Sequence, residues 1–254
     1  MTASSEVLNI KAIKVSCHDC SLAELCLPRG LNEAEITELD HAIQHRRTIH
    51  RGDHLYRMGD RGRSVFVVRT GSIKTYLSTG AGDEQVVGFH LPGEILGLDV
   101  FDNEQYSSGA IALETSSVCE LSGHHFEEIC KTVPAMNTQM CRLVSREITH
   151  DHEMLLLLGK KMAEERLATF LQSLSERLQK RGLSGTKFNL SMSRQDMGNY
   201  LGLAVETISR LFARFQQEGI LTVERRLVSI RNPAGLKSMI SSHQHGQPVR
   251  SAQK

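Results

Sequence analysis

Five glycine-containing turns divide residues 46–121 into short runs that are rich in β-branched and aromatic side chains. The clearest runs are SVFVV at 64–68 and SIKTYL at 72–77, and the turns include RGD at 51–53 and PGE at 92–94. Many short strands with regular turn signals between them are typical of a β-barrel or β-roll. We therefore predict a β-roll for this part of the chain.

A long helical pattern follows over residues 135–160. A helix of about 24 residues would span roughly 36 Å, at 1.5 Å per residue. Its apolar positions recur at a period near 3.5 and comprise Met136, Met140, Leu143, Ile148, Met154, Leu155 and Leu158. A stripe with this period predicts a partner helix, such as that of a second copy of the chain. The alternative is a helix that packs on its own domain.

The candidate dimer contacts lie in the middle of this helix and are Ile148, Asp151, Met154 and Leu155. In a parallel symmetric pair the two copies of Asp151 would approach each other. Like charges at a partly desolvated interface oppose association. We therefore expect a marginal dimer, in which a modest gain elsewhere decides the equilibrium. In the alternative interpretation, Asp151 points to solvent and has no effect.

Residues 191–221 read as two short helices that are joined by the tight turn Leu201-Gly202-Leu203. Ser193 and Asp196 resemble a capping box at the start of the first helix. On the second helix, helical spacing predicts a buried face of Ile208, Leu211, Phe212 and Phe215. The opposite face carries Glu206, Ser209, Arg210 and Gln217.

The polar face of the second helix has the chemistry of base recognition. Arginine bonds guanine bidentately and glutamate accepts from cytosine N4, and a helix-turn-helix places such residues at the start of its second helix. The strand-like segments at 221–223 and 227–230 flank ERR at 224–226, which predicts a wing that contacts phosphate. The alternative is that Glu206 and Arg210 form a solvated ion pair.

The order of β-roll, long helix and winged helix-turn-helix resembles the cyclic-AMP receptor protein/FNR superfamily of bacterial transcription regulators. VETISR at 205–210 resembles the recognition helix of the FNR branch, the fumarate and nitrate reductase regulators. GNYLGL at 198–203 and LLLLGKKMAEERLATFL at 155–171 also match that branch. The resemblance covers residues 15–235. It implies that Glu206, Ser209 and Arg210 read TTGAT-type half-sites in double-stranded DNA.

The implied fold class is α+β, with a cyclic-nucleotide-binding-like β-roll, a long dimerisation helix and a C-terminal winged helix-turn-helix. The expected boundaries are a cysteine-bearing iron–sulfur arm at 1–30, the β-roll at 31–134, the dimerisation helix at 135–160, the DNA-binding domain at 161–240 and a disordered tail at 241–254.

Three of the six cysteines stand close together, as Cys17-x2-Cys20-x5-Cys26. A [4Fe–4S] cluster normally takes four cysteine thiolates, and a structural zinc ion takes the same ligands in tetrahedral geometry. Zinc sites usually have two Cys-x-x-Cys pairs, and only one is present, so the spacing favours a cluster without excluding zinc. The FNR resemblance implies the cluster, with Cys119 as its fourth ligand.

The resemblance further implies an oxygen sensor that controls anaerobic gene expression. With the cluster intact, two protomers pair, bind a palindromic site and contact RNA polymerase; oxygen degrades the cluster and DNA binding is lost. A cyclic nucleotide is not expected. The superfamily's phosphate-binding segment carries an Arg-Ser step, whereas this chain keeps Gly93 and Glu94 but has no arginine in YSSG at 106–109.

Other classes of protein are less compatible with the sequence. Lys plus Arg number 30 and Asp plus Glu number 29, so any basic surface is local. No signal peptide or membrane span is recognisable, which predicts a cytoplasmic chain with reduced thiols. A zinc-stapled or nucleotide-binding module on the same scaffold stays open. An iron–sulfur enzyme would need acid/base groups in a substrate pocket, and we find no such constellation, so we predict that the chain is not an enzyme.

Overall fold

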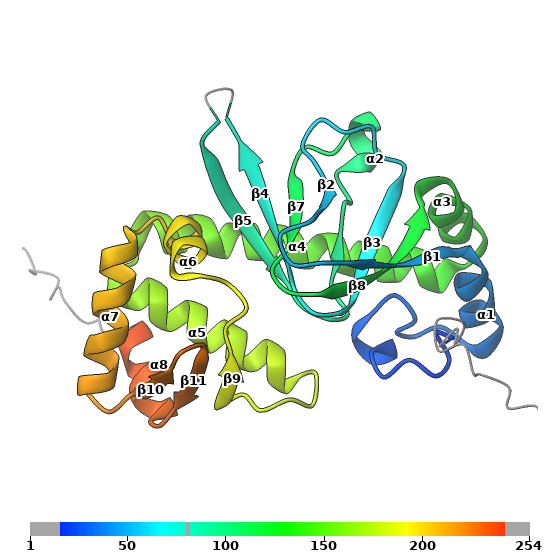
Figure 1. Ribbon diagram of the computed structural model, residues 1–254. Coiled ribbons are helices and arrows are strands. Elements are labelled where there is room, and N and C mark those ends of the chain that lie inside the picture. The colour runs from blue at the N-terminus through cyan, green and yellow to red at the C-terminus, as the bar shows by residue number, and fades with distance from the viewer. Residues whose placement is uncertain (1–15, 80–81, 242–254) are drawn as a thin grey trace, which may run out of the picture.

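The computed structural model describes residues 16–79 and 82–241 (Figure 1). The predicted tail lies outside these ranges from residue 242 on, and so does the first half of the predicted arm. The N-terminal elements are a 3-10 turn η2 (Ala23–Leu25), α1 (Glu33–Ala42), β1 (Ile43–Ile49), β2 (His54–Tyr56), β3 (Ser64–Thr70), β4 (Ile73–Ser78), β5 (Glu84–His90), β6 (Ile95–Leu96), α2 (Val100–Asn103), β7 (Gly109–Ala112), β8 (Ser116–Ser122) and α3 (Gly123–Thr132).

The strands form two antiparallel sheets, in the orders β1-β8-β3-β6 and β2-β7-β4-β5. Buried apolar side chains from both sheets form one core, which side chains of α1 and α3 join. The β-roll predicted from the glycine turns is confirmed. The strands at 64–68 and 72–77 are observed as β3 and β4.

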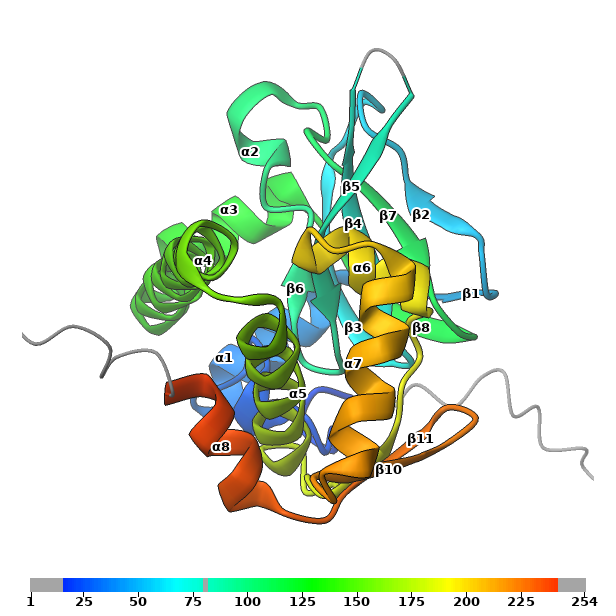
Figure 2. The ribbon, with the colours of Figure 1, turned by 90° about the vertical axis from the view of Figure 1, so that its left-hand side faces the viewer.

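The long helix α4 (Pro134–Lys160) has 27 residues and crosses the molecule from the β-roll to the C-terminal unit (Figure 1). Figure 2 views this helix nearly along its axis. Proline stands at its first turn, where the missing N–H costs no helical hydrogen bond. Met136 and Leu143 are buried in the core of the β-roll, whereas Leu157 belongs to the core of the C-terminal unit. Ile148 and Leu155, which belong to the same predicted stripe, are exposed, so the single apolar stripe expected from the sequence comprises two different faces.

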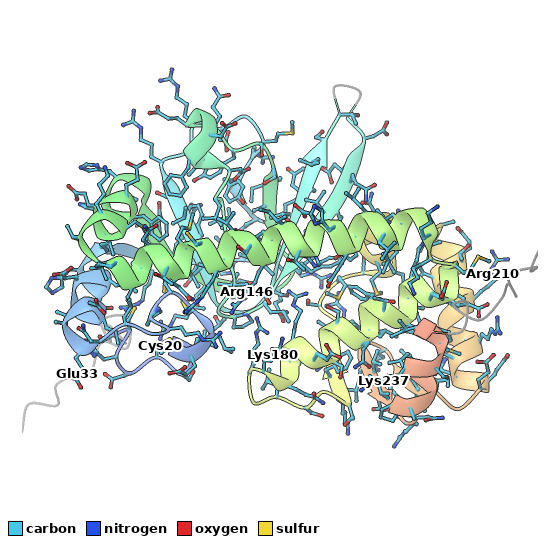
Figure 3. The ribbon with its side chains drawn as sticks, turned by 180° about the vertical axis from the view of Figure 1, so that it is seen from behind. Cys20, Glu33, Arg146, Lys180, Arg210 and Lys237 are labelled. Atoms are coloured by element: carbon cyan, nitrogen blue, oxygen red, sulfur yellow. The ribbon has the colours of Figure 1, made fainter. Side chains whose placement is uncertain are left out.

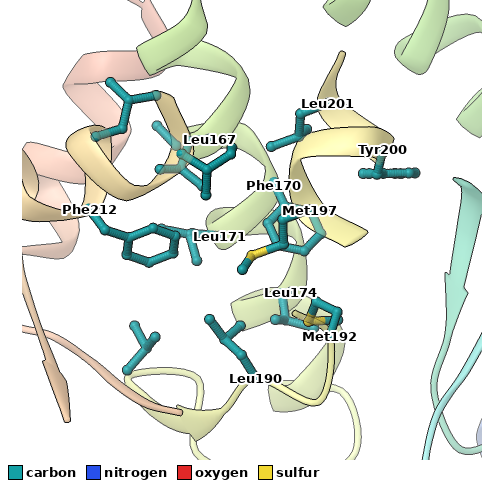
Figure 4. Close-up of a cluster of buried hydrophobic side chains, with 14 of the residues drawn as sticks. Leu167, Phe170, Leu171, Leu174, Leu190, Met192, Met197, Tyr200, Leu201 and Phe212 are labelled. Atoms are coloured by element: carbon teal, nitrogen blue, oxygen red, sulfur yellow. The ribbon is translucent and has the colours of Figure 1, made fainter. Parts of the chain in front are cut away.

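The C-terminal unit comprises α5 (Ala163–Gln179), β9 (Lys187–Asn189), α6 (Arg194–Leu201), α7 (Val205–Gln217), β10 (Leu221–Glu224), β11 (Leu227–Ile230) and α8 (Pro233–Ser241). Its three strands pair in the order β10-β11-β9. Side chains of α5, α6 and α7 meet in one core (Figure 4). Ile208, Leu211, Phe212 and Phe215 are all buried there, as the helical spacing predicted.

The two units pack against each other within one chain. Val86, Phe89 and Leu91 of the β-roll join the core of the C-terminal unit. Lys74 Nζ lies 2.6 Å from Asp196 Oδ1 at the start of α6. On the other side of the junction, Glu94 accepts hydrogen bonds from two arginines of α5 and of the turn that follows it, Arg177 and Arg181. In the part of the chain that the structure describes, no helix is long and apolar enough to cross a membrane.

Candidate metal centre and nucleic-acid interface

The cysteine-bearing arm folds as consecutive tight turns against α1. Cys20 N–H donates to Cys17 O and Ala23 N–H donates to Cys20 O, so the chain reverses around the first two cysteines. Asp40 Oδ1 on α1 accepts from Cys17 N–H at 3.0 Å and fixes the start of the arm. Leu25 packs against Gly93, where an added Cβ would lie only 3.1 Å from Leu25 Cβ.

Four of the six cysteines line one cavity between the arm and the β-roll. Cys17, Cys20 and Cys26 come from the arm, and Cys119 comes from β8. The other lining residues are Leu22, Ala23, Leu27, Pro28, Leu39, Ile43, Val67, Val68, Arg69 and Leu121. β8 lies between β1 and β3, which pair with Cys119 through Arg46 and Val67. Cys130 and Cys141 lie elsewhere, on α3 and α4.

Burial governs the protonation of these thiols. It raises the pKa of Cys26 to about 12 and also raises the pKa of Cys17. The nearby Asp40 carboxylate raises the pKa of Cys17 further. The pKa of Cys119 is raised by burial, although the Arg46 guanidinium opposes the rise. The thiols of Cys17, Cys26 and Cys119 are therefore protonated at neutral pH when no metal is bound, and a bound metal would have to displace their protons.

The donor set, four cysteine thiols around one cavity, is of the kind that a [4Fe–4S] cluster takes. A zinc ion with Zn–S bonds of about 2.3 Å needs sulfur atoms about 3.8 Å apart, and among the described residues no group of three or more Cys, His, Asp or Glu is close enough to hold one ion. A four-iron cube spreads its thiolates further apart. Arg46 Nε is buried and has no hydrogen-bond partner among the residues that the structure describes, and this guanidinium lies beside Cys119. A cation there suits thiolate and sulfide, which are anionic.

Sequence reasoning missed the pair formed by Arg46 and Asp40. Arg46 Nη2 lies 3.4 Å from Asp40 Oδ1, and Asp40 also holds the backbone of Cys17. The pair therefore connects the first cysteine of the arm with the cysteine on β8. Arg46 belongs to HRR at 45–47, but nothing in the sequence distinguishes it from Arg47, because only the strand register turns Arg46 toward Cys119.

The helix-turn-helix has the geometry that its sequence predicts. Ser193 Oγ accepts from Asp196 N–H at 3.0 Å, and the Asp196 carboxylate accepts from Ser193 N–H at 2.9 Å, so the capping box is complete. Gly202 ends α6 with φ of +63°, in the left-handed region that favours glycine. The arginine Arg194 stacks over the ring of Phe212, 3.2 Å from its centre, and so fixes α6 on α7.

The three predicted base-contacting residues are exposed on the first two turns of α7. Ser209 Oγ donates to Val205 O at 2.9 Å, and Arg210 Nη2 donates to Thr207 Oγ1 at 3.3 Å. Arg210 thus bonds within its own helix rather than to Glu206. Arg225, in the turn of the wing, has φ of +56°. Both the helix and the wing are open to solvent.

On α4, an exposed stripe alternates steps of three and four residues. It consists of Cys141, Val144, Ile148, Asp151, Leu155, Leu158 and Met162, the last lying just beyond the helix. Ile148 is 50% exposed and Leu155 is 71% exposed, which is unusual for large apolar side chains unless another surface covers them. Met154 lies apart from the stripe and packs against the core of the C-terminal unit. Figure 3 shows this helix running uncovered along one side of the molecule.

Comparison with known proteins agrees with this arrangement. Residues 46–133 match the cyclic nucleotide-binding domain, and residues 165–239 match the Crp-like helix-turn-helix domain. The chain belongs to the Crp/FNR family of transcription regulators. It is 46% identical over 243 residues to the transcriptional activator protein Anr of Pseudomonas aeruginosa, which covers 95% of this chain and 100% of that protein.

Other members of the Crp/FNR family are similar over nearly as much of the chain. The fumarate and nitrate reduction regulatory protein of Vibrio cholerae is 47% identical over 225 residues, which is 89% of this chain and 90% of that protein. Among solved structures, FixK2 from Bradyrhizobium japonicum superposes with a TM-score of 0.71 at 29% identity, covering 77% of this chain and 96% of that one. The sequence-based assignment to this family and its fold is confirmed.

Because the β-roll matches a cyclic nucleotide-binding domain, the segment around Asp99, Ser107 and Ser108 shows whether its backbone and hydroxyl donors are available to a phosphate. Asp99 Oδ2 accepts from the backbone N–H groups of Ser107 and Ser108, at 2.8 and 3.1 Å, and from both hydroxyl groups. The donors that could cradle a phosphate are thus bonded to a carboxylate of the same chain. Glu94 is bonded to Arg177 and Arg181.

Proposed function

We propose that this Crp/FNR family member is an oxygen-responsive transcription regulator, whose sensor is a [4Fe–4S] cluster held by Cys17, Cys20, Cys26 and Cys119. The observation that carries the proposal is the convergence of these four cysteines, and of neither remaining cysteine, on one cavity. When bound, the cluster would make the protein sensitive to oxygen, because oxygen degrades the cluster. The residues of the chain supply the anchorage, because three ligands lie on the arm and one lies on a central strand.

The exposed stripe on α4 supports pairing of two chains through this helix. Steps of three and four residues place Ile148 and Leu155 on one seam, as in a two-stranded coiled coil. Asp151 occupies the same seam and brings two carboxylates together at the interface, which weakens pairing. We propose that the cluster-loaded arm favours the dimer, and that its loss leaves mainly single chains.

A paired chain is proposed to read double-stranded DNA in the cytoplasm. In a symmetric dimer the two α7 helices would enter successive major grooves of a palindromic site. Glu206, Ser209 and Arg210 are exposed for contacts with TTGAT-type half-sites. RNA polymerase is the proposed further partner at promoters, consistent with the relatives that are named activators.

The contacts of Asp99 and Glu94 support a regulator that does not respond to cyclic nucleotides. A phosphate would have to displace the Asp99 carboxylate from four hydrogen bonds, and like charges would repel each other. The relatives named as activators and regulators also support the prediction that the chain is no enzyme.

The test is purification without oxygen, with iron and sulfide analysis and a visible spectrum, followed by DNA binding before and after exposure to air. We expect about four irons and four sulfides per chain and visible absorbance that bleaches in air. Binding to a TTGAT palindrome should be lost together with that absorbance. A colourless chain with one zinc per molecule and air-insensitive DNA binding would refute the proposal.

A further inference from the structure

One polar side chain connects the cysteine-bearing arm directly to α4. Gln139 is fully buried, and its Nε2 donates to the backbone carbonyl of Cys26 at 3.2 Å. Cys26 is the last cysteine of the arm and lines the cavity. The hydrogen bond therefore joins a proposed cluster ligand to the helix that carries the proposed dimer stripe.

The position of Gln139 is otherwise that of an apolar residue. It stands between Met136 and Leu143, which are buried on the same face of α4 against the β-roll. A buried amide is destabilising unless it is hydrogen-bonded. Gln139 Oε1 already lacks a hydrogen-bond partner among the described residues, so the amide depends on the bond from its Nε2 to Cys26 O to offset its burial.

The bond is sensitive to the conformation of the arm. Cys26 O belongs to a segment held by turns, and its position depends on how the arm packs over the cavity. If the segment shifts, the Gln139 amide loses its acceptor while it is still enclosed by the helix and the sheet. Movement or fraying of the first turns of α4 then relieves the loss.

We propose that Gln139 is a positioning residue that couples the state of the arm to α4, and through it to pairing of two chains; the proposal rests on the proposed function. With the cluster bound, Cys26 is fixed, Gln139 is satisfied and α4 holds the register in which the stripe from Val144 to Leu158 pairs. Without the cluster, Gln139 loses Cys26 O and α4 leaves that register. The signal is transmitted from one face of α4 to the opposite face.

The experiment compares the dimer dissociation constants of cluster-loaded and cluster-free protein by sedimentation equilibrium, without oxygen, for the wild type and Gln139→Met. Methionine has a similar length and no amide. We expect normal iron and sulfide content in Q139M, but a ratio of the two dissociation constants that is at least about tenfold smaller than in the wild type. Thr138→Val is the matched control, because it removes a hydroxyl that donates to Pro134 O within α4; it should keep the wild-type ratio.

A Q139M protein that loads normally and keeps the wild-type ratio overturns the proposal. Hydrogen exchange of the wild type tests it without any variant: amides at 136–143 should exchange faster in the cluster-free protein, and equal exchange also overturns it. A wild-type chain that binds no iron or sulfide overturns the proposed function itself, which separates the two failures.

Discussion

Replacing Glu94 by glutamine is expected to weaken the junction between the β-roll and the C-terminal unit by about 3 kcal/mol at pH 7. Burial alone would raise the pKa of Glu94, but its ion pairs with Arg177 and Arg181 outweigh burial and hold the pKa at about 2 instead of 4.5. At about 1.4 kcal/mol per pKa unit, roughly 2.5 units correspond to about 3 kcal/mol. Glutamine keeps the shape and leaves two guanidinium groups without a counter-charge.

The effect has a defined pH dependence. Because the pKa of Glu94 is lower in the folded chain, its stabilisation is complete above pH 4.5 and is lost as the pH falls toward 2. For a single group the linkage relation gives a loss of about 0.8 kcal/mol at pH 4 and about 2 kcal/mol at pH 3. The difference between the wild type and the variant should therefore shrink over this range.

Urea unfolding followed by circular dichroism measures this difference. With a slope of about 2 kcal/mol per molar urea, 3 kcal/mol moves the first transition by about 1.5 M. Glu128→Gln is the matched control, because Glu128 is 54% exposed and pairs with the exposed His124; its effect should stay below about 0.5 kcal/mol. An E94Q midpoint equal to that of the wild type at pH 7, or a gap that does not change between pH 7 and pH 3, would refute the reasoning.

Three further predictions concern the proposed regulator. Asp151→Ala should give more dimer in air, because it removes two facing carboxylates; unchanged sedimentation under oxygen would contradict the placement of Asp151. Arg46→Met should lower iron and sulfide per chain, because no cation then faces Cys119, whereas Arg47→Met, an exposed neighbour, should not; equal loading of both variants would count against that role. Arg210→Ala should cost about 1–3 kcal/mol in binding to the specific site, measured by fluorescence anisotropy, with little change on unrelated DNA; an equal loss on both would argue against base contact.

Local sequence patterns predicted the features that form within a single helix or turn. The buried face of α7 follows from four large apolar residues at helical spacing, and the capping box follows from Ser193 and Asp196. The turn at Gly202 follows from glycine's access to positive φ. In each case the sequence separation of the interacting residues is short, so the pattern can be recognised without tertiary information.

Contacts between distant segments could not be predicted in the same way. Apolar residues on opposite faces of α4 merge into one stripe in the sequence, and Met154 was placed with Leu155 although only Leu155 is on the exposed seam. Arg46 acquires its place beside Cys119 from strand register. Gln139 had a local signal, a polar residue between Met136 and Leu143, but its partner Cys26 is known only from the fold.

In the proposed dimer, the acidic residue within the otherwise apolar stripe of α4 would make the abundance of the protein part of its response. When pairing is weak, the paired fraction depends on the total concentration of chain by mass action. In that dimer a seam without Asp151 would pair chains more tightly, whereas the seam with Asp151 would leave single chains at low expression and pairs at high expression. The amount of chain that a cell makes would therefore shift the oxygen level at which its promoters respond, with no change in the sensor itself.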